Sequence, residues 1–190
     1  MKKDVVESLF RKLMEDGLGF DLSDPNLCDT PARVARMYCE EFFCNCCEEF
    51  ADFKAFPNIH NYNQIIISDL ISFVSVCSHH FLPFTGQGWV LYIPDDKLIG
   101  ASKPARLIEH YAARPQLQEN LCHEVLNSLV AGISPKGAMV VLRAIHGCMK
   151  CRGVRQMKSG MGTSAVEGAF KQPDVKAEGM DLIKLSLLCD

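Results

Sequence analysis

Four apolar runs in the second half of the chain constrain its fold more than any other feature. They are QIIISDLISFVSVC (residues 64–77), GQGWVLYIP (residues 86–94), AMVVLRAIH (residues 138–146) and TSAVEGAF (residues 163–170). VRQMK (residues 154–158) is a further short candidate strand. Runs that are rich in β-branched and aromatic residues and are bounded by Gly, Pro or Asp are typical of strands. We therefore expect two β-hairpins.

Helical patterns occupy the segments before, between and after these runs. We expect helices at residues 4–16, 31–50, 103–114, 115–132 and 174–188, with Pro115 separating the middle pair. Helices followed by a hairpin, a helix pair and a second hairpin indicate an α+β fold with an antiparallel sheet. Such a sheet exposes its edges unless another copy covers them, so we expect an oligomer.

Composition narrows the class of protein. The chain has 190 residues, of which 48% are hydrophobic and 23% charged, as in a soluble globular domain. No apolar run reaches the length of a membrane span, about 18 residues, and Asp4 and Glu7 interrupt the start of the chain where a signal peptide would need apolar residues. A net charge of −3 gives no case for binding nucleic acid or an anionic membrane. We expect a cytoplasmic protein.

The chain is rich in cysteine, with ten residues. In a cytoplasmic protein these thiols are reduced, and they serve as core residues, metal ligands or catalytic groups. Four of them lie within the second expected helix, at Cys39, Cys44, Cys46 and Cys47. No histidine accompanies them and their spacing follows an amphipathic helix, so we interpret them as thiols that pack the helix.

Two other cysteines stand beside histidines, in CSHH (residues 77–80) and HGC (residues 146–148), each at the end of an expected strand. Thiolate and imidazole are the usual ligands of zinc, and three protein ligands are typical of a catalytic zinc ion (Zn2+), four of a structural one. The spacing leaves open whether His79 or His80 is the ligand. It also leaves open whether Cys151 or a second histidine adds a fourth ligand.

Groups for proton transfer and substrate binding surround these motifs. Imidazole titrates near neutral pH, so His146 and the histidine of residues 79–80 that does not bind the metal are candidates for acid–base catalysis. Cations lie nearby in the sequence at Lys103, Arg106, Lys150, Arg152, Arg155 and Lys158. Cations clustered beside a metal suggest a polyanionic substrate such as a nucleoside triphosphate. Gln118 and Glu119 offer an amide and a carboxylate that can read the donor edge of a purine.

Together these motifs resemble the GTP cyclohydrolase I family. The resemblance runs in unbroken order from about residue 29 to 172, through TPARVARMY (30–38), CSHHFLPFTGQGWVLYIPDDKLIGASKPAR (77–106), RPQLQE (114–119), HGCMKCRGVR (146–155) and TSAVEGAF. It implies the tunnelling fold, an antiparallel sheet with helices on one face, preceded by an N-terminal helical region. The sheets of neighbouring subunits close into an oligomeric barrel in this fold.

The resemblance also implies an assembly and a division of the chain. Two stacked pentamers would form a homodecamer with active sites at the subunit interfaces. Residues 1–55 would form the N-terminal helical region and residues 56–190 the catalytic tunnelling-fold domain.

The implied reaction is zinc-dependent hydrolysis of GTP at C8, with release of formate and rearrangement to 7,8-dihydroneopterin triphosphate. This is the first step of pterin and tetrahydrofolate biosynthesis. By motif position, the resemblance assigns the zinc ion to Cys77, His80 and Cys148, and catalysis to His79 and His146. It assigns the guanine base to Gln118 and Glu119, and the triphosphate to Ser102, Lys103, Arg106, Arg152 and Arg36, the last from a neighbouring subunit.

The sequence departs from the family pattern at several positions, and Arg36 falls where the family often has a lysine. Ser78 stands where the family usually has glutamate, Asn120 replaces a common arginine, and Cys151 adds a thiol. Two alternative functions stay open: a tunnelling-fold relative that acts on another purine or pterin, such as a nitrile reductase, and a catalytically silent subunit that binds zinc or a nucleotide. The HGC motif argues against the first alternative, and Ser78 is the feature that favours the second.

Overall fold

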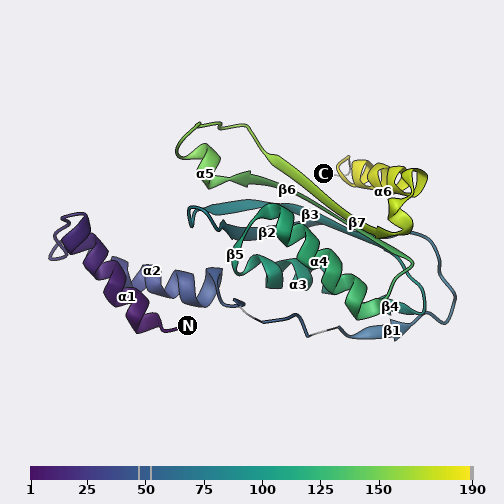
Figure 1. The fold of residues 1–190 in the computed structure, drawn as a ribbon, viewed down its shortest axis with the longest axis horizontal. Coiled ribbons are helices and arrows are strands. Elements are labelled where there is room, and N and C mark those ends of the chain that lie inside the picture. The colour runs from purple at the N-terminus through teal and green to yellow at the C-terminus, as the bar shows by residue number, and fades with distance from the viewer. Residues whose placement is uncertain (47, 52, 189–190) are drawn as a thin grey trace.

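A five-stranded sheet forms the centre of the molecule in the computed structural model, which describes residues 1–46, 48–51 and 53–188 (Figure 1). Its strands, in spatial order, are β5 (Pro115–Gln116), β2 (Ile66–Cys77), β3 (Pro83–Ile93), β6 (Gly137–His146) and β7 (Met161–Gly168). All neighbours are antiparallel except β5, which lies parallel to β2. A separate two-stranded sheet joins β1 (Ala55–Pro57) to β4 (Lys97–Ile99). The expected α+β fold with an antiparallel sheet is confirmed.

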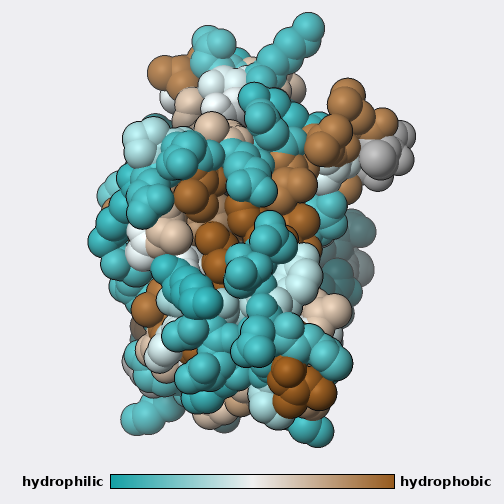
Figure 2. All heavy atoms as spheres, turned by 90° about the vertical axis from the view of Figure 1, so that its right-hand side faces the viewer, coloured by the Kyte–Doolittle hydropathy of each residue, from teal (hydrophilic) through white to brown (hydrophobic). Residues whose placement is uncertain are grey.

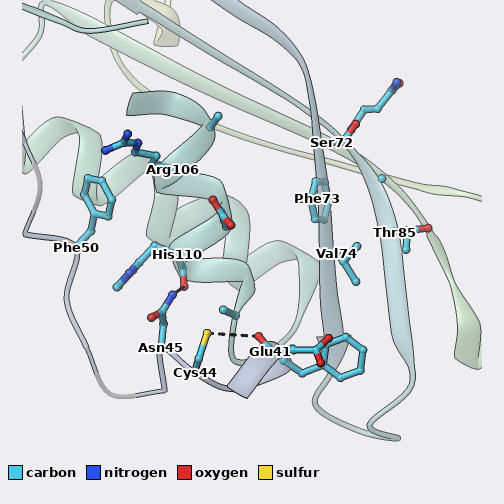
Figure 3. A pocket seen from close by; sticks show the side chains of 16 residues that line it. Glu41, Cys44, Asn45, Phe50, Ser72, Phe73, Val74, Thr85, Arg106 and His110 are labelled. Atoms are coloured by element: carbon cyan, nitrogen blue, oxygen red, sulfur yellow. Dashed lines mark hydrogen bonds between the residues drawn. The ribbon is translucent and has the colours of Figure 1, made fainter. Parts of the chain in front are cut away.

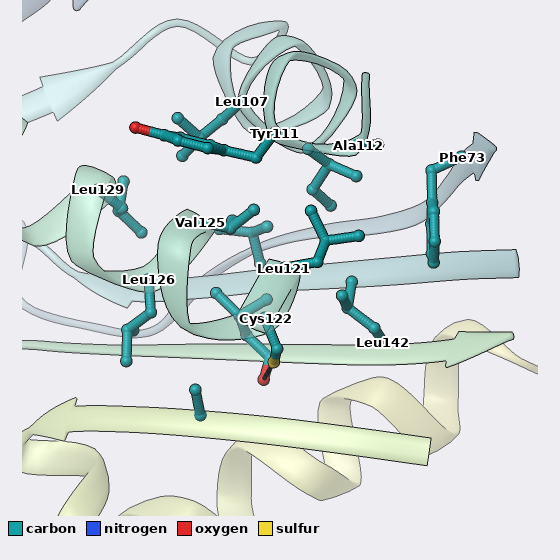
Figure 4. Packing of buried hydrophobic residues seen from close by; sticks show 14 of the residues in the cluster. Phe73, Leu107, Tyr111, Ala112, Leu121, Cys122, Val125, Leu126, Leu129 and Leu142 are labelled. Carbon is teal, nitrogen blue, oxygen red and sulfur yellow. Dashed lines mark hydrogen bonds between the residues drawn. The ribbon is translucent and has the colours of Figure 1, made fainter. Parts of the chain in front are cut away.

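Helices α3 (Lys103–Ala112) and α4 (Gln118–Ile133) cover one face of this sheet and bury the main core (Figure 4). Leu107 and Tyr111 of α3 and Leu121 of α4 lie in this core. The buried α4 residues recur at helical spacing (Leu121, Cys122, Val125, Leu126, Leu129 and Ile133), which is the pattern of a helix with one apolar face. The two expected helices around Pro115 are thus confirmed, with β5 between them.

The opposite face of the sheet is also apolar at one end. Trp89 and Leu91 of β3 point away from α3 and α4, because successive side chains of a strand alternate between its faces. They pack with Phe170 and with helix α6 (Pro173–Ser186), and the Trp89 indole nitrogen Nε1 donates a hydrogen bond of 3.1 Å to Ser186 Oγ. The C-terminal helix therefore covers the second face, in addition to the helices expected on the first.

The N-terminal helices lie beyond the end of the sheet that carries α5 (Gly147–Lys150) in Figure 1. Helix α1 (Lys3–Lys12) continues into a π-helical turn at Leu13–Gly17, and α2 (Thr30–Arg36) continues into another at Met37–Phe42. The two helices pack on each other, and Lys3 Nζ forms an ion pair of 2.6 Å with Glu40. The expected helix at residues 4–16 is confirmed.

The second expected helix ends at Phe42 rather than at residue 50. Phe43 leaves the helical conformation at φ −124° and its ring stacks on Tyr38 with centroids 5.2 Å apart. Phe81, which follows the first histidine motif, packs against both rings. Contacts with another part of the chain therefore end this helix. Of the four neighbouring cysteines, Cys39 and Cys46 are half-buried and Cys44 is exposed, whereas Cys47 lies outside the described residues.

Residues 154–158 do not form the expected short strand. Gly153 and Arg155 have positive φ angles of 58° and 50°, and this left-handed conformation interrupts an extended chain. The segment is instead an irregular connection between α5 and β7.

The sheet keeps open edges in a single chain. Among the described residues, β7 has no partner on its outer edge, and β2 is paired on its outer edge only at Val76 and Cys77. Figure 2 shows one end of the molecule, where apolar side chains gather in patches among hydrophilic ones. Closure into an oligomeric barrel and the boundary at residue 55 stay proposals. No helix within the described ranges is long and apolar enough to cross a membrane.

Candidate metal centre

Three potential metal ligands come together at one end of the sheet. Cys77 is the last residue of β2, His80 lies in the tight turn that follows, and Cys148 lies in the short helix α5 after β6. Their ligand atoms all lie within 4.8 Å of one another, and Cys77 Sγ is 3.9 Å from His80 Nδ1. Within the described part of the chain, this is the one group of three or more such residues that could hold a metal ion. Of the two histidines between which spacing does not choose, His80 belongs to this group and His79 does not.

The turn that holds the first two ligands is closed by backbone hydrogen bonds. The N–H of Cys77 donates to Leu82 O at 2.9 Å, and the N–H of Phe81 donates to Cys77 O at 2.9 Å. Phe81 adopts a left-handed conformation, with φ 52°, and the Tyr38 hydroxyl donates to its carbonyl oxygen at 3.4 Å. The N-terminal helices therefore contact the loop that carries His80.

The donor set fits a thiophilic cation. Two thiols and an imidazole are ligands that zinc prefers among protein side chains. Burial, followed by the neighbouring Cys77 thiol, raises the pKa of Cys148. A bound cation would offset the cost of ionising Cys148, because metal coordination favours the thiolate. Cys151, an exposed thiol three residues further on, is not a member of the group.

His146 is held next to this group by two contacts. Its ring stacks on Phe84, with centroids 4.5 Å apart and planes inclined by 5°, and its Nε2 lies 2.8 Å from Gln118 Oε1. Burial lowers the pKa of His146, and the negative charge of Glu119 opposes that effect. His146 thus has a fixed ring beside a carboxylate.

The other expected residues near the metal centre are exposed. The ring of His79 lies 6.1 Å from that of His80. Glu119 lies in the first turn of α4, directly after the buried Gln118. Arg152 is close enough to Cys148 for its charge to lower the pKa of that thiol, against the larger effect of burial. The structure therefore brings the expected metal, base and acid–base residues to one end of the sheet.

Three of the expected triphosphate residues lie farther from the metal centre of the same chain. Ser102 and Lys103 begin α3, and Arg106 follows one turn later. The other end of α3 lies near the metal centre, since Ser75 Oγ of β2 donates to Ala112 O at 2.8 Å. A helix of this length spans about 15 Å, so α3 separates its first residues from the metal centre.

Arg106 also lines a cavity of about 1050 Å3, together with Glu41, Asn45 and His110 (Figure 3). The cavity lies between α3, the strands β2 and β3, and the chain that follows the second π-helical turn. Arg36 is exposed on α2 and does not line it.

Phe84 and Thr163 belong to this site but were not anticipated from the sequence. Phe84 pairs with His146 in the register of β3 and β6, and Thr163 Oγ1 accepts a hydrogen bond from Gln118 at 3.1 Å. Phe84 can be identified from the pairing register of β3 and β6. That register can be used only once β3 is known to lie beside β6, which the sequence does not show.

Comparison with known proteins gives a consistent result. A family model described as GTP cyclohydrolase I matches residues 6–184. GTP cyclohydrolase 1 of Rhodopirellula baltica is 41% identical over 186 residues, which cover 94% of this chain and 77% of the relative. GTP cyclohydrolase 1 of Bacillus subtilis is 39% identical over 193 residues, covering 97% of both chains. A solved structure of an archaeosine synthase QueF-Like is 17% identical, with a TM-score of 0.47 over 56% of this chain and 95% of that one.

Proposed function

Because the chain belongs to the GTP cyclohydrolase I family, we propose that it hydrolyses GTP at C8, releases formate and forms 7,8-dihydroneopterin triphosphate. The observation that carries this proposal is the meeting of Cys77, His80 and Cys148 within 4.8 Å, beside His146. A hydrolytic centre and a candidate proton donor thus stand together. The HGC motif (residues 146–148) supplies Cys148 to the metal group and His146 to proton transfer. Its presence argues against the alternative of a tunnelling-fold relative, such as a nitrile reductase, which would lack this part of the metal site.

The metal in this proposal is zinc, held by Cys77, His80 and Cys148. When bound, zinc acts as a Lewis acid and lowers the pKa of water to about 7, which supplies a nucleophile for hydrolysis at neutral pH. Cys77 is buried and Cys148 half-buried, while His80 is exposed. The two thiols would therefore hold the ion from the protein interior, and the exposed His80 would be its ligand nearest to solvent.

The base is read by Glu119. Its carboxylate can accept hydrogen bonds from N1–H and the 2-amino group of guanine, a pair of donors that adenine does not present. Glu119 is exposed in the first turn of α4, where the helix dipole favours a negative charge. Recognition through paired donors and acceptors discriminates strongly, since the wrong base leaves them unpaired.

Proton transfer falls to His146 or His79. Protonation of the purine at N7 makes C8 more electrophilic, and an imidazole is suited to give and take that proton near neutral pH. His146 is buried with a fixed ring, whereas His79 is exposed in the turn after β2. Its burial shields His146 itself from most of the bulk water.

The triphosphate is bound by Ser102, Lys103, Arg106, Arg152 and Arg36 in this proposal. Three of them lie at the far end of α3, away from the metal centre of the same chain. A site in which a neighbouring subunit supplies the first turn of α3 brings them to the metal. The open edges of β2 and β7 are where such neighbours would join, in a homodecamer that closes the sheet. The cytoplasmic location expected from the sequence stays a prediction.

Subunit complementation tests the shared site. We expect His80→Ala and Arg106→Ala each to be inactive as pure proteins. Coexpressed in one cell, they form mixed oligomers in which some sites combine an intact metal centre with an intact Arg106. Recovered activity in the mixed oligomer supports a site between subunits, and no recovery contradicts it.

Incubation of the zinc-loaded protein with GTP tests the reaction. Formate and, after oxidation and dephosphorylation, fluorescent neopterin are the expected products. A zinc-replete oligomer that yields neither would favour the silent subunit, and restoration of activity by Ser78→Glu would assign that silence to Ser78, which is exposed between two of the metal-site residues.

A further inference from the structure

The side chain of Gln118 is the centre of a buried hydrogen-bond cluster. Gln118 is the first residue of α4 and is 1% exposed. Its Nε2 lies 3.1 Å from each of three acceptors, namely Leu142 O, Met161 O and Thr163 Oγ1. Its Oε1 lies 2.8 Å from Nε2 of His146. The amide thus joins α4 to the strands β6 and β7 and to a candidate catalytic histidine.

These partners determine which way the amide faces. The carbonyl oxygens of Leu142 and Met161 can only accept hydrogen bonds, so the NH2 group of Gln118 must face them. Its carbonyl oxygen Oε1 therefore faces His146. Because Oε1 cannot donate, Nε2 of His146 must carry the hydrogen in this contact. The backbone of two strands thereby determines the tautomer of neutral His146.

The plane of the imidazole is fixed as well. Phe84 is fully buried and stacks on His146 with the planes inclined by 5°. Phe84 and His146 are directly paired in the register of β3 and β6, so the stack is built into the sheet. No hydrogen bond within the described part of the chain engages Nδ1 of His146. Nδ1 is then the ring nitrogen that remains for a ligand.

We propose that Gln118 is a positioning residue that holds His146 as the Nε2–H tautomer, so that Nδ1 is the ring nitrogen presented to the guanine base. The inference rests on the proposed function, in which His146 exchanges a proton with the substrate. It changes the role that motif position assigns to Gln118, from a reader of the base to a support of the acid–base residue. Base reading is left to the exposed Glu119.

The contacts of Gln118 favour this role over base reading. Both hydrogens of its amide are taken by three acceptors, and its oxygen is taken by His146. To read a base, the side chain would have to leave these partners. The buried carbonyl oxygens of Leu142 and Met161 would then lose their hydrogen bonds from Gln118. An unsatisfied buried polar group costs about 1–3 kcal/mol.

The first test replaces Gln118 by Met, which keeps the length of the side chain and removes its hydrogen bonds. We expect kcat to fall about 10- to 100-fold, as when residues that orient metal-binding histidines are replaced, with KM for GTP changed less than about 3-fold. A raised KM with unchanged kcat would instead make Gln118 a base reader and overturn the inference.

The second test observes the tautomer directly. Solid-state NMR of the zinc-loaded, sedimented protein, labelled with 15N-histidine, distinguishes protonated from unprotonated ring nitrogens. The His146 signals are those that disappear in His146→Gln. We expect Nε2–H and a bare Nδ1 in the wild type, and a mixture of tautomers in Gln118→Met. A wild type with Nδ1–H, or an unchanged tautomer in Gln118→Met, contradicts the inference.

Gln116→Met is the matched control. Gln116 is also a buried glutamine, 3% exposed, and it donates to Tyr111 O at 2.9 Å and Glu124 Oε2 at 2.5 Å; neither hydrogen bond involves His146. Loss of the Gln116 hydrogen bonds in Gln116→Met should lower the stability of the protein, as Gln118→Met does. It should leave the tautomer of His146 unchanged. If Gln118→Met fails to fold, the wild-type spectrum alone still tests the inference, because an Nδ1–H tautomer of His146 in the wild type contradicts it.

Different results would contradict the proposed function and the positioning role of Gln118. If wild-type protein yields no formate and no dihydroneopterin triphosphate, the proposed function fails whatever the NMR result. If wild-type protein is active but the tautomer does not depend on Gln118, only the positioning role fails.

Discussion

Replacement of Phe84 by Leu separates the structural role of this ring from its role at the site. Phe84 is fully buried, stacks on His146 at 4.5 Å and packs edge-to-face on Phe73 at 6.1 Å. Loss of the two ring contacts removes about 0.5–1.5 kcal/mol each, and the partial cavity adds about 1 kcal/mol. The expected loss of stability is therefore about 2–4 kcal/mol, which lowers Tm by about 4–16 °C for a chain of this size.

The same variant should lose activity while it keeps its metal. Without the stack, the His146 ring can tilt, so we expect kcat to fall about 10-fold at unchanged zinc content. Thermal unfolding, metal analysis and steady-state kinetics check the three quantities. Phe170→Leu is the control, because Phe170 is also fully buried but lies in the core on the opposite face of the sheet. Unchanged kcat in folded Phe84→Leu would refute the view that the stack orients His146.

Three further predictions concern the ligands, the base and the buried thiols. His80→Ala and Cys148→Ala should lose zinc and reduce turnover to background, measured by elemental analysis and formate release; a variant that keeps stoichiometric zinc and full activity would exclude that residue as a ligand. Glu119→Ala should raise KM for GTP at least 10-fold with little change in Tm, because the side chain is exposed, and an unchanged KM and kcat would refute base reading by Glu119. Burial raises the pKa of Cys122 to about 11, above the value of about 8.5 in an unfolded chain. The contribution of Cys122 to stability is therefore complete below about pH 8.5 and is lost as the pH rises toward 11. Alkylation of the native protein at pH 8 should spare Cys122 and label the exposed Cys44 and Cys151. Rapid labelling of Cys122 would contradict its burial.

Much of the fold follows from local sequence pattern. The long apolar strands and the helices on either side of Pro115 are local features, and they appear where periodicity places them. The end of the second helix is not local, since Phe43 leaves the helix to pack against Phe81, which is distant in sequence. The expected strand at residues 154–158 fails because Gly153 and Arg155 adopt positive φ angles that apolar alternation does not reveal.

The metal centre was predictable in composition but not in geometry. Cysteine and histidine at two strand ends indicate zinc, yet Cys77 and Cys148 meet only because β3 lies between β2 and β6. Spacing does not contain that strand order, and the choice of His80 over His79 depends on the shape of one turn. The hydrogen bonds of Gln118 are less predictable still, because they join α4 to two strands that follow it in the chain.

The proposed reaction opens the imidazole ring of GTP and expels C8 as formate. The most direct measurement follows [8-13C]GTP by 13C NMR during incubation with the zinc-loaded wild-type protein. We expect the label to leave the purine and appear in formate, with one dihydroneopterin triphosphate formed for each formate. If the label stays in the purine when zinc-replete protein is given saturating GTP, the proposed function is contradicted.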